Sequence, residues 1–433
     1  MSFISSSAKE REHILATIGI ESEEELFSCI PEELRLRRTL DLEGPCDEQT
    51  LRRRFRVQHE PVLFTGGGIY RHVIPALVDS IARRQEFLTA YTPYQPEFSQ
   101  GTLQAIFEYQ SMMASLTGMH AANASMYDGA TALAEAAIMA TRITGIRRIL
   151  VSRATNPHYR NVLRTYLQHA EGVEIIEVPL DSITGRIDLS ALENMTGPDA
   201  AFFFQNPNYF GVLEPVGEIS TISAGCTLWG VVVSEAISLG ALRPPGSFGA
   251  DVVVGEAQSF GNPPTGGGPL LGFFCTTRDH IRKMPGRIVG LTHDLMGRQA
   301  FCLTLSTREQ HIRREKATSN ICTNQGLCAL RAALYLSALG PAGLRKTAIQ
   351  CASGARYLHD LLKTQGIEPV FSSPFFHEFV IRMDERTYTR LEHDGIIPGI
   401  RIDAFYPEIS DGVLVNVTEM NTKEDCACLI KRL

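Results

Sequence analysis

Residues 91–136, YTPYQPEFSQGTLQAIFEYQSMMASLTGMHAANASMYDGATALAEA, join a proline-interrupted loop to two predicted helices. The two prolines exclude a helix from the first seven residues, because proline lacks a backbone donor and extends the residue before it. Apolar spacing after Ser99 predicts a helix that ends at Gly118. A small-residue turn at 127–131 then leads into an alanine-rich helix. Its free N-terminal amides are suited to an anion, although such a turn is more often a packed helix start.

Apolar runs alternate with helical patterns from residue 140 to 275. Runs without polar interruptions predict strands covered on both faces, and the helices between them predict a parallel or mixed sheet. Polar groups follow three of the runs, at 156–160, 205–209 and 234–236. Ligands bind at the carboxyl ends of such strands, but Asn-Pro pairs are also ordinary turn residues.

The order and wording of the first stretch are more specific than its parts. Its YTPYQPE-SQGTLQ segment, followed by NASMYDGATA, resembles the N-terminal half of the glycine cleavage P-protein, a glycine decarboxylase that depends on pyridoxal phosphate. Residues 307–325, TREQHIRREKATSNICTNQ, resemble a second motif of that family. Many bacteria and archaea split this enzyme into two chains, and the length of this sequence is similar to that of the first.

The resemblance implies an α/β fold of the fold-type I, aspartate aminotransferase-like PLP enzymes, with a mixed, mostly parallel central sheet. It implies an N-terminal helical arm at residues 1–60, a large α/β domain at 61–325 and a small C-terminal α+β domain at 326–433. In that fold a glycine-rich turn holds the coenzyme phosphate, and a strand-end acid pairs with the ring nitrogen. The matching, vestigial pocket positions here are Asp128, Gly129, Ala130, Thr131, His158, Asn206 and Glu235, or Ser234 if the alignment slips by one.

The lysine that forms the coenzyme aldimine is missing from its expected place. No lysine occurs from residue 10 to 282, and Ser259, preceded by Gln258, stands near that position. A Schiff base requires an amine, which neither side chain supplies. Lys283 and Lys316 lie in charged runs that are typical of solvated helices. The resemblance therefore implies that a homologous, lysine-bearing partner subunit binds pyridoxal phosphate covalently.

Active sites of this fold lie between two subunits, so the resemblance implies that this chain completes its partner's site. The expected contributors are Tyr91, Thr92, Tyr94, Gln95 and Glu97, with Ser99 and Gln100 behind them. We hypothesise that the tyrosines border the substrate pocket. Gln95 or Glu97 would then position polar groups near the glycine carboxylate. The alternative is a loop that only seals the interface. His72 follows three glycines and matches a family loop near the cleft, although by spacing alone it is a structural histidine.

The implied function is that of a subunit of a heteromeric glycine dehydrogenase (aminomethyl-transferring). The enzyme decarboxylates glycine and passes the aminomethyl group to the lipoyl arm of the H-protein, and two copies of each chain (α2β2) are expected. One alternative is a scaffold or regulatory subunit without a catalytic contribution. The other is a self-sufficient PLP enzyme that uses Lys283.

Composition narrows the function further. The net charge of −7 gives no basic surface for nucleic acid. No run reaches the roughly 18 apolar residues of a membrane span, and the first residues lack a secretory pattern, so a cytoplasmic location is expected. The ten cysteines form no CxxC pair with a matching second pair. No metal site is therefore predicted.

Overall fold

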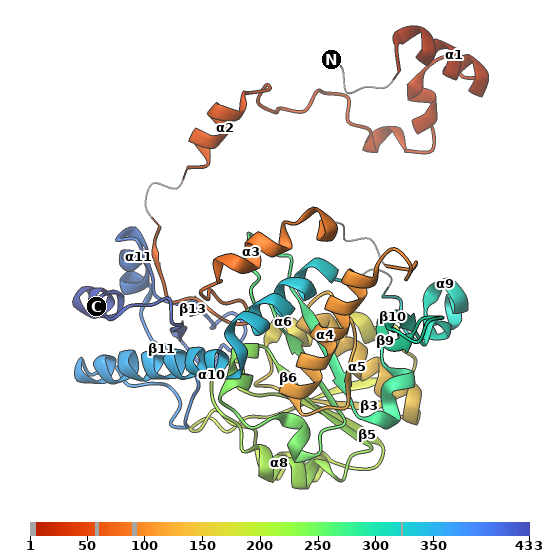
Figure 1. Ribbon diagram of the computed structural model, residues 1–433. Coiled ribbons are helices and arrows are strands. Elements are labelled where there is room, and N and C mark those ends of the chain that lie inside the picture. Colours follow the sequence, from red (N-terminus) through yellow and green to blue (C-terminus); the bar gives the residue numbers. More distant parts are fainter. Residues whose placement is uncertain (1–5, 57–59, 89–92, 322–323) are drawn as a thin grey trace. The chain divides into compact units, whose positions relative to one another are not determined.

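The computed structural model describes residues 6–56, 60–88, 93–321 and 324–433 (Figure 1). The chain divides into two compact units, Met1–His59 and Glu60–Leu433. The predicted boundary between residues 325 and 326 falls inside the second unit, where the long helix α10 begins. Tyr91 and Thr92 of the predicted site lie outside the described residues.

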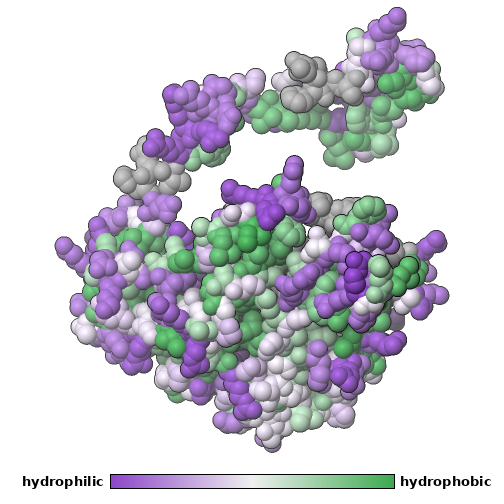
Figure 2. Space-filling model, viewed as in Figure 1, coloured by the Kyte–Doolittle hydropathy of each residue, from purple (hydrophilic) through white to green (hydrophobic). Residues whose placement is uncertain are grey.

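The first unit consists of short helical elements without a core of their own. They are α1 (Ala8–Ile18), η1 (Glu23–Phe27), η2 (Glu32–Leu34) and α2 (Glu48–Arg54), and none has a buried residue. Side-chain caps begin the two α-helices, since Ser7 accepts from the Glu10 amide and Asp47 from the Thr50 amide. Apolar side chains reach the surface of this unit, among them Phe55 at 80% exposure (Figure 2).

A seven-stranded sheet forms the centre of the second unit. Its order is β2-β8-β7-β6-β5-β3-β4, and the pairs from β7 to β4 are all parallel, whereas β8 runs antiparallel to both neighbours. The strands are β2 (Ala121–Ala122), β3 (Arg148–Ser152), β4 (Glu174–Val178), β5 (Ala200–Gln205), β6 (Leu228–Val233), β7 (Val252–Glu256) and β8 (Gly272–Thr276). The predicted mixed, mostly parallel sheet is confirmed.

Helices cover both faces of this sheet (Figure 1). Side chains alternate between the faces along each strand, so Phe202 and Phe204 pack in one core cluster and Phe203 in the other. The first cluster includes residues of α3 (Ala76–Ala82), α4 (Gln100–Thr117), α7 (Leu189–Met195), α8 (Val216–Ser223) and α10 (Gly326–Thr364). The second includes residues of α5 (Gly129–Thr144) and α6 (Pro157–Leu167). The apolar runs of the central strands are therefore buried on both faces of the sheet.

Helix α10 leads from the large sheet to the C-terminal part of the chain. It is kinked at Gly340 (φ 59°, ψ −178°), just before Pro341. It is the one helix of the described residues that is long and apolar enough to cross a membrane, and it packs on α3, α4 and the short helix η4 (Ala236–Gly240). These contacts place α10 in the core of the unit.

A small antiparallel sheet forms the C-terminal part, with the order β11-β14-β13. Its strands are β11 (Glu378–Arg382), β13 (Ile400–Arg401) and β14 (Gly412–Asn416), with the helices α11 (Glu385–His393) and α12 (Lys423–Arg432). Strand β1 (Val62–Leu63) pairs in parallel with β12 (Ile396–Ile397), which ties the beginning of the second unit to its end.

A separate hairpin follows the short helix η6 (Arg278–Lys283). It pairs β9 (Ile288–His293) with β10 (Gln299–Thr304), and α9 (Gln310–Arg313) comes soon after it. The remaining short helices are η3 (Gln85–Phe87), η5 (Pro245–Phe248), η7 (Ser306–Arg308) and η8 (Arg314–Lys316).

Candidate functional site

The predicted phosphate turn lies at the N-terminus of α5. Asp128 caps this helix, since its Oδ1 accepts from the Thr131 amide at 2.7 Å. Ala130 is buried in the first turn. The Gly129 amide donates to Glu256 Oε2 at 3.0 Å, and a Cβ atom on Gly129 would collide with the Tyr159 hydroxyl group. In this predicted phosphate turn, the Gly129 amide therefore has a partner within the chain, and the Tyr159 side chain packs closely against Gly129.

Glu256 ends strand β7 and is 2% exposed. Its second oxygen, Oε1, accepts from the amides of Gln258 (2.9 Å) and Leu271 (2.7 Å). Burial raises the pKa of Glu256 to about 8, although its three N–H donors favour the ionised form.

Glu235 follows strand β6 and is 1% exposed. Its Oε1 accepts from the Ile237 amide at 2.7 Å, and its Oε2 accepts from the Ser259 hydroxyl group at 3.0 Å. Burial alone would raise the pKa of Glu235, but His72 and His377 outweigh it and hold that pKa at about 2. The structure thus brings together two residues that the resemblance placed at the ring-nitrogen and lysine positions.

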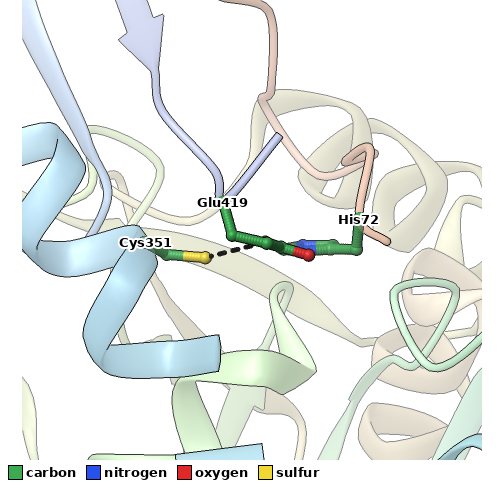
Figure 3. Close-up of side chains that lie close together, drawn as sticks. All are labelled: His72, Cys351 and Glu419. Carbon is green, nitrogen blue, oxygen red and sulfur yellow. Dashed lines mark hydrogen bonds and ion pairs between the residues drawn. The ribbon is translucent and has the colours of Figure 1, made fainter. Parts of the chain in front are cut away.

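His72 bridges two carboxylates. Its Nε2 lies 3.3 Å from Glu235 Oε2, and its Nδ1 lies 2.8 Å from Glu419 Oε2. Figure 3 shows the His72 and Glu419 side chains next to each other. The Cys351 thiol donates to the same Glu419 oxygen at 3.2 Å. Burial lowers the pKa of His72, but Glu235, Cys351 and Glu419 together raise it well above its usual value. His72 therefore lies between two carboxylates, Glu235 and Glu419, that both favour its protonated form.

Two predicted pocket residues have their contacts elsewhere. His158 is exposed in the first turn of α6, and its ring meets Phe405 edge-on with 4.9 Å between centroids. Asn206 accepts from the Glu214 amide at 3.0 Å through its Oδ1. Within the predicted pocket, the structure joins Gly129 to the end of β7 and Glu235 to Ser259. The side chains of His158 and Asn206 make only the local contacts described above.

Loop 93–99 is anchored at both ends and exposed between them. Arg287 Nη2 donates to the Tyr94 hydroxyl oxygen at 2.5 Å, and the guanidinium lies 5.1 Å from the centre of that ring. Gln100 Nε2 donates to the carbonyl groups of Pro96 (2.7 Å) and Phe301 (2.9 Å). Gln95 and Glu97 are exposed, as are Tyr94 and Phe98, and Ser99 is half-buried at the N-cap of α4.

The residues around Glu235 do not fit a covalently bound pyridoxal phosphate. Ser259 stands beside the carboxylate, where an amine is required. Lys283 and Lys316 are both exposed, at the ends of η6 and η8. The Gly129 amide of the predicted phosphate turn is already bonded to Glu256, so this turn does not fit the coenzyme phosphate either.

Sequence reasoning missed three groups of this region, Glu256, Glu419 and Cys351. Glu256 had a signal, because an acid at the end of an apolar strand run is unusual and needs a partner. Glu419 and Cys351 had none, since Glu419 lies 347 positions from His72 and only the fold brings them together.

The fold is that of the PLP-dependent transferases of fold type I. Its marks are the sheet order, the turn at the start of α5 and the acid Glu235 after strand β6. Solved structures with this fold include a NifS-like protein (14% identity, TM-score 0.64, 86% of this chain and 98% of that chain). Another is a C-DES mutant with glycine covalently linked to its PLP cofactor (15% identity, TM-score 0.62, 86% of this chain and 96% of that chain). At these identities the likeness concerns the fold alone.

The family is decided by closer relatives. The family model for the glycine cleavage system P-protein matches residues 1–433, and the chain belongs to this family. A probable glycine dehydrogenase (decarboxylating) subunit 1 from Moorella thermoacetica is 48% identical over 99% of this chain and 98% of its own length. The namesake from Aquifex aeolicus is 46% identical over 98% of both.

A crystal structure of glycine decarboxylase (P-protein) of the glycine cleavage system, in inhibitor-bound form, is also similar. It is 41% identical, with a TM-score of 0.84 over 100% of this chain and 99% of that chain. The resemblance and the fold class predicted from the sequence are both confirmed.

Proposed function

We propose that this chain is the coenzyme-free subunit of a heteromeric glycine dehydrogenase (decarboxylating) and completes the active site of a homologous, lysine-bearing subunit. The full-length relatives that are named subunit 1 support a split enzyme. The observation that carries the assignment is the pair of contacts that fill the coenzyme's place, Glu256 on Gly129 and Ser259 on Glu235. Pyridoxal phosphate is then the partner's cofactor.

In this proposal the partner's coenzyme acts as the electron sink for glycine decarboxylation, and the aminomethyl group passes to the lipoyl H-protein. The contribution of this chain is loop 93–99, which presents the phenol of Tyr94 and the carboxylate of Glu97 beside the exposed amide of Gln95. The anchors at Arg287 and Gln100 fix these groups before the partner binds. Such fixed groups orient a substrate without further ordering on binding.

Covalent trapping tests where the coenzyme sits. The two chains are co-expressed, reduced with borohydride in the presence of pyridoxal phosphate, and digested for mass spectrometry. We expect a pyridoxyl-lysine in the partner and an unlabelled Lys283 in this chain. A label on Lys283 would instead support the self-sufficient enzyme.

Loop substitutions test the contribution to the site. We expect Tyr94→Phe and Glu97→Gln to lower glycine decarboxylation by the reconstituted pair about tenfold each, in the range of a lost polar contact to a reacting group. Glu424→Gln, an exposed position on α12, is the matched control.

The scaffold alternative has one observation in its favour, because Tyr94 and Gln100 already bind the chain itself. It requires that both loop variants assemble with the partner and keep the wild-type rate. Assembly is followed by size-exclusion chromatography in the same preparations.

A further inference from the structure

Three side chains of types that can bind metal ions converge from distant parts of the chain (Figure 3). His72 lies between the glycine run and α3, Cys351 on α10, and Glu419 after β14. One ligand atom from each lies within 4.8 Å of the other two. His72 and Cys351 are buried, and the Glu419 side chain is 10% exposed.

We propose that His72 Nδ1, Cys351 Sγ and Glu419 Oε2 bind a thiophilic divalent cation, for which zinc is the best match. Zinc takes nitrogen, thiolate and carboxylate ligands at about 2.0–2.3 Å, which places tetrahedral ligand atoms roughly 3.3–3.8 Å apart. The measured separations from Glu419 Oε2 are 2.8 Å to Nδ1 and 3.2 Å to Sγ. Hydrogen bonds hold these atoms slightly closer than a metal would.

Binding exchanges two protons for the cation. The Nδ1 proton of His72 and the thiol proton of Cys351 leave, and zinc forms bonds to the freed nitrogen and sulfur. The carboxylate of Glu419 and the thiolate of Cys351 then compensate the two charges of the cation. Binding therefore leaves no uncompensated charge in the interior.

The groups behind the ligands match those of a metal site. A metal-bound histidine usually donates its other ring N–H to a carboxylate, and His72 Nε2 faces Glu235 Oε2 at 3.3 Å. The other oxygen of Glu419 accepts from the Val73 amide at 2.8 Å, which orients the ligand oxygen toward His72 and Cys351.

A further buried imidazole lies behind these groups. The side chain of His377 is 1% exposed, and its Nε2 lies 3.6 Å from Glu235 Oε2, the oxygen that also faces His72 Nε2. Glu235 is thus held in place between two histidines.

The metal would join three segments that the sequence keeps far apart. They are the loop before α3, the second half of α10 and the segment after the small sheet. A zinc ion at this point stabilises their packing in the way that structural zinc stabilises small domains. This role is independent of the partner's chemistry, so it stands or falls separately from the proposed function.

Metal content and cobalt spectroscopy test the proposal on the full chain. We expect about one zinc per chain by mass spectrometry of the purified protein. After chelation, Co²⁺ should give a thiolate-to-cobalt absorption band in the near ultraviolet. Cys351→Ser should abolish the band and the zinc, and Cys226→Ser, a half-buried cysteine elsewhere, should keep both.

Two further variants distinguish metal binding at this cluster from misfolding of a variant and from metal binding at surface thiols. Glu235→Gln keeps all three ligands, and we expect it to weaken Co²⁺ binding about 10–100-fold. The double variant Cys29→Ser/Cys46→Ser removes the two exposed thiols and should bind as the wild type does. Absence of the band in the wild type, its survival in Cys351→Ser, or its loss with the two exposed thiols would each overturn the proposal.

Discussion

At the scale of single residues, Glu256 occupies the Gly129 amide in the predicted phosphate turn at the start of α5. One carboxylate accepts three backbone N–H groups from three segments, at Gly129, Gln258 and Leu271. An external anion makes the same kind of contact at a helix N-terminus. The acceptor oxygens that these amides need are supplied from within the chain.

Removing this carboxylate should destabilise the protein and create an anion site. Glu256→Ala leaves three N–H groups unpaired, at about 1–3 kcal/mol for each buried group. We expect a lower melting temperature that millimolar phosphate partly restores, because the anion binds the folded variant. Glu256→Gln keeps an acceptor oxygen and should respond less. An equal response of the wild type to phosphate would contradict this explanation.

The pH dependence of stability should report the Glu235–His72 pair. The pKa of Glu235 is held at about 2 in the folded chain, below its usual 4.5. Its contribution is therefore present above pH 4.5 and is lost as the pH falls toward 2, which amounts to about 3 kcal/mol.

Glu235→Gln should remove this part of the acid sensitivity. Urea unfolding at several values between pH 3 and pH 6 measures the slope for the variant and the wild type. Equal slopes would show that Glu235 does not titrate in this way.

Residue positions within one motif could be predicted from the sequence, and positions joined only by the fold could not. Gly129, Glu235 and Ser259 were named from the family resemblance, which assigns each one to a position in its own motif, with Ser234 and Gln258 as the neighbouring alternatives. The partners of His72 could not be predicted in this way. Its ring contacts one carboxylate at a strand end, Glu235, and another in the C-terminal segment, Glu419.

At the scale of elements, most strands and helices follow the predicted pattern, and one boundary shows where the pattern fails. Asn156-Pro157 is common turn material, yet here it begins α6, with Asn156 Oδ1 accepting from the His158 amide at 3.0 Å. Proline suits the first helical position, since its missing N–H would be unpaired there anyway. Composition alone does not distinguish this helix start from a turn.

The anchor at Gln100 fixes the position of loop 93–99. Gln100→Ala removes the bonds to Pro96 and to the backbone of Phe301 in β10. We expect a roughly fivefold higher KM for glycine in the reconstituted pair, because loop ordering then costs binding energy. Steady-state kinetics with each variant measure the change.

Gln104→Ala is the matched control, since this side chain lies on the same helix and bonds only to the exposed Glu108. A similar loss in both variants would mean that α4 itself, and not the loop, had been disturbed.

At the scale of the whole molecule, the five hydrophobic core clusters all lie within residues 60–433. The first unit contributes no buried residue from its helices. Burial of apolar surface dominates folding stability, so the second unit has what it needs to fold alone.

A chain that starts at Glu60 should therefore remain folded. We expect its melting temperature to stay within a few degrees of that of the full chain. A loss of 1 kcal/mol in the free energy of unfolding lowers the melting temperature of a protein of this size by about 2–4 °C or less. Differential scanning calorimetry compares the two. A large drop would show that the arm stabilises the body of its own chain.

The carboxylate at the α5 turn also has a consequence for the cell. Enzymes of this fold that hold their coenzyme draw stability from a vitamin B6 derivative, by simple mass action. In the function proposed above the coenzyme belongs to the partner, and Glu256 already satisfies the Gly129 amide of this chain. We therefore expect the chain to fold without the vitamin and to accumulate intact under B6 starvation, ready to assemble once its partner has bound the coenzyme.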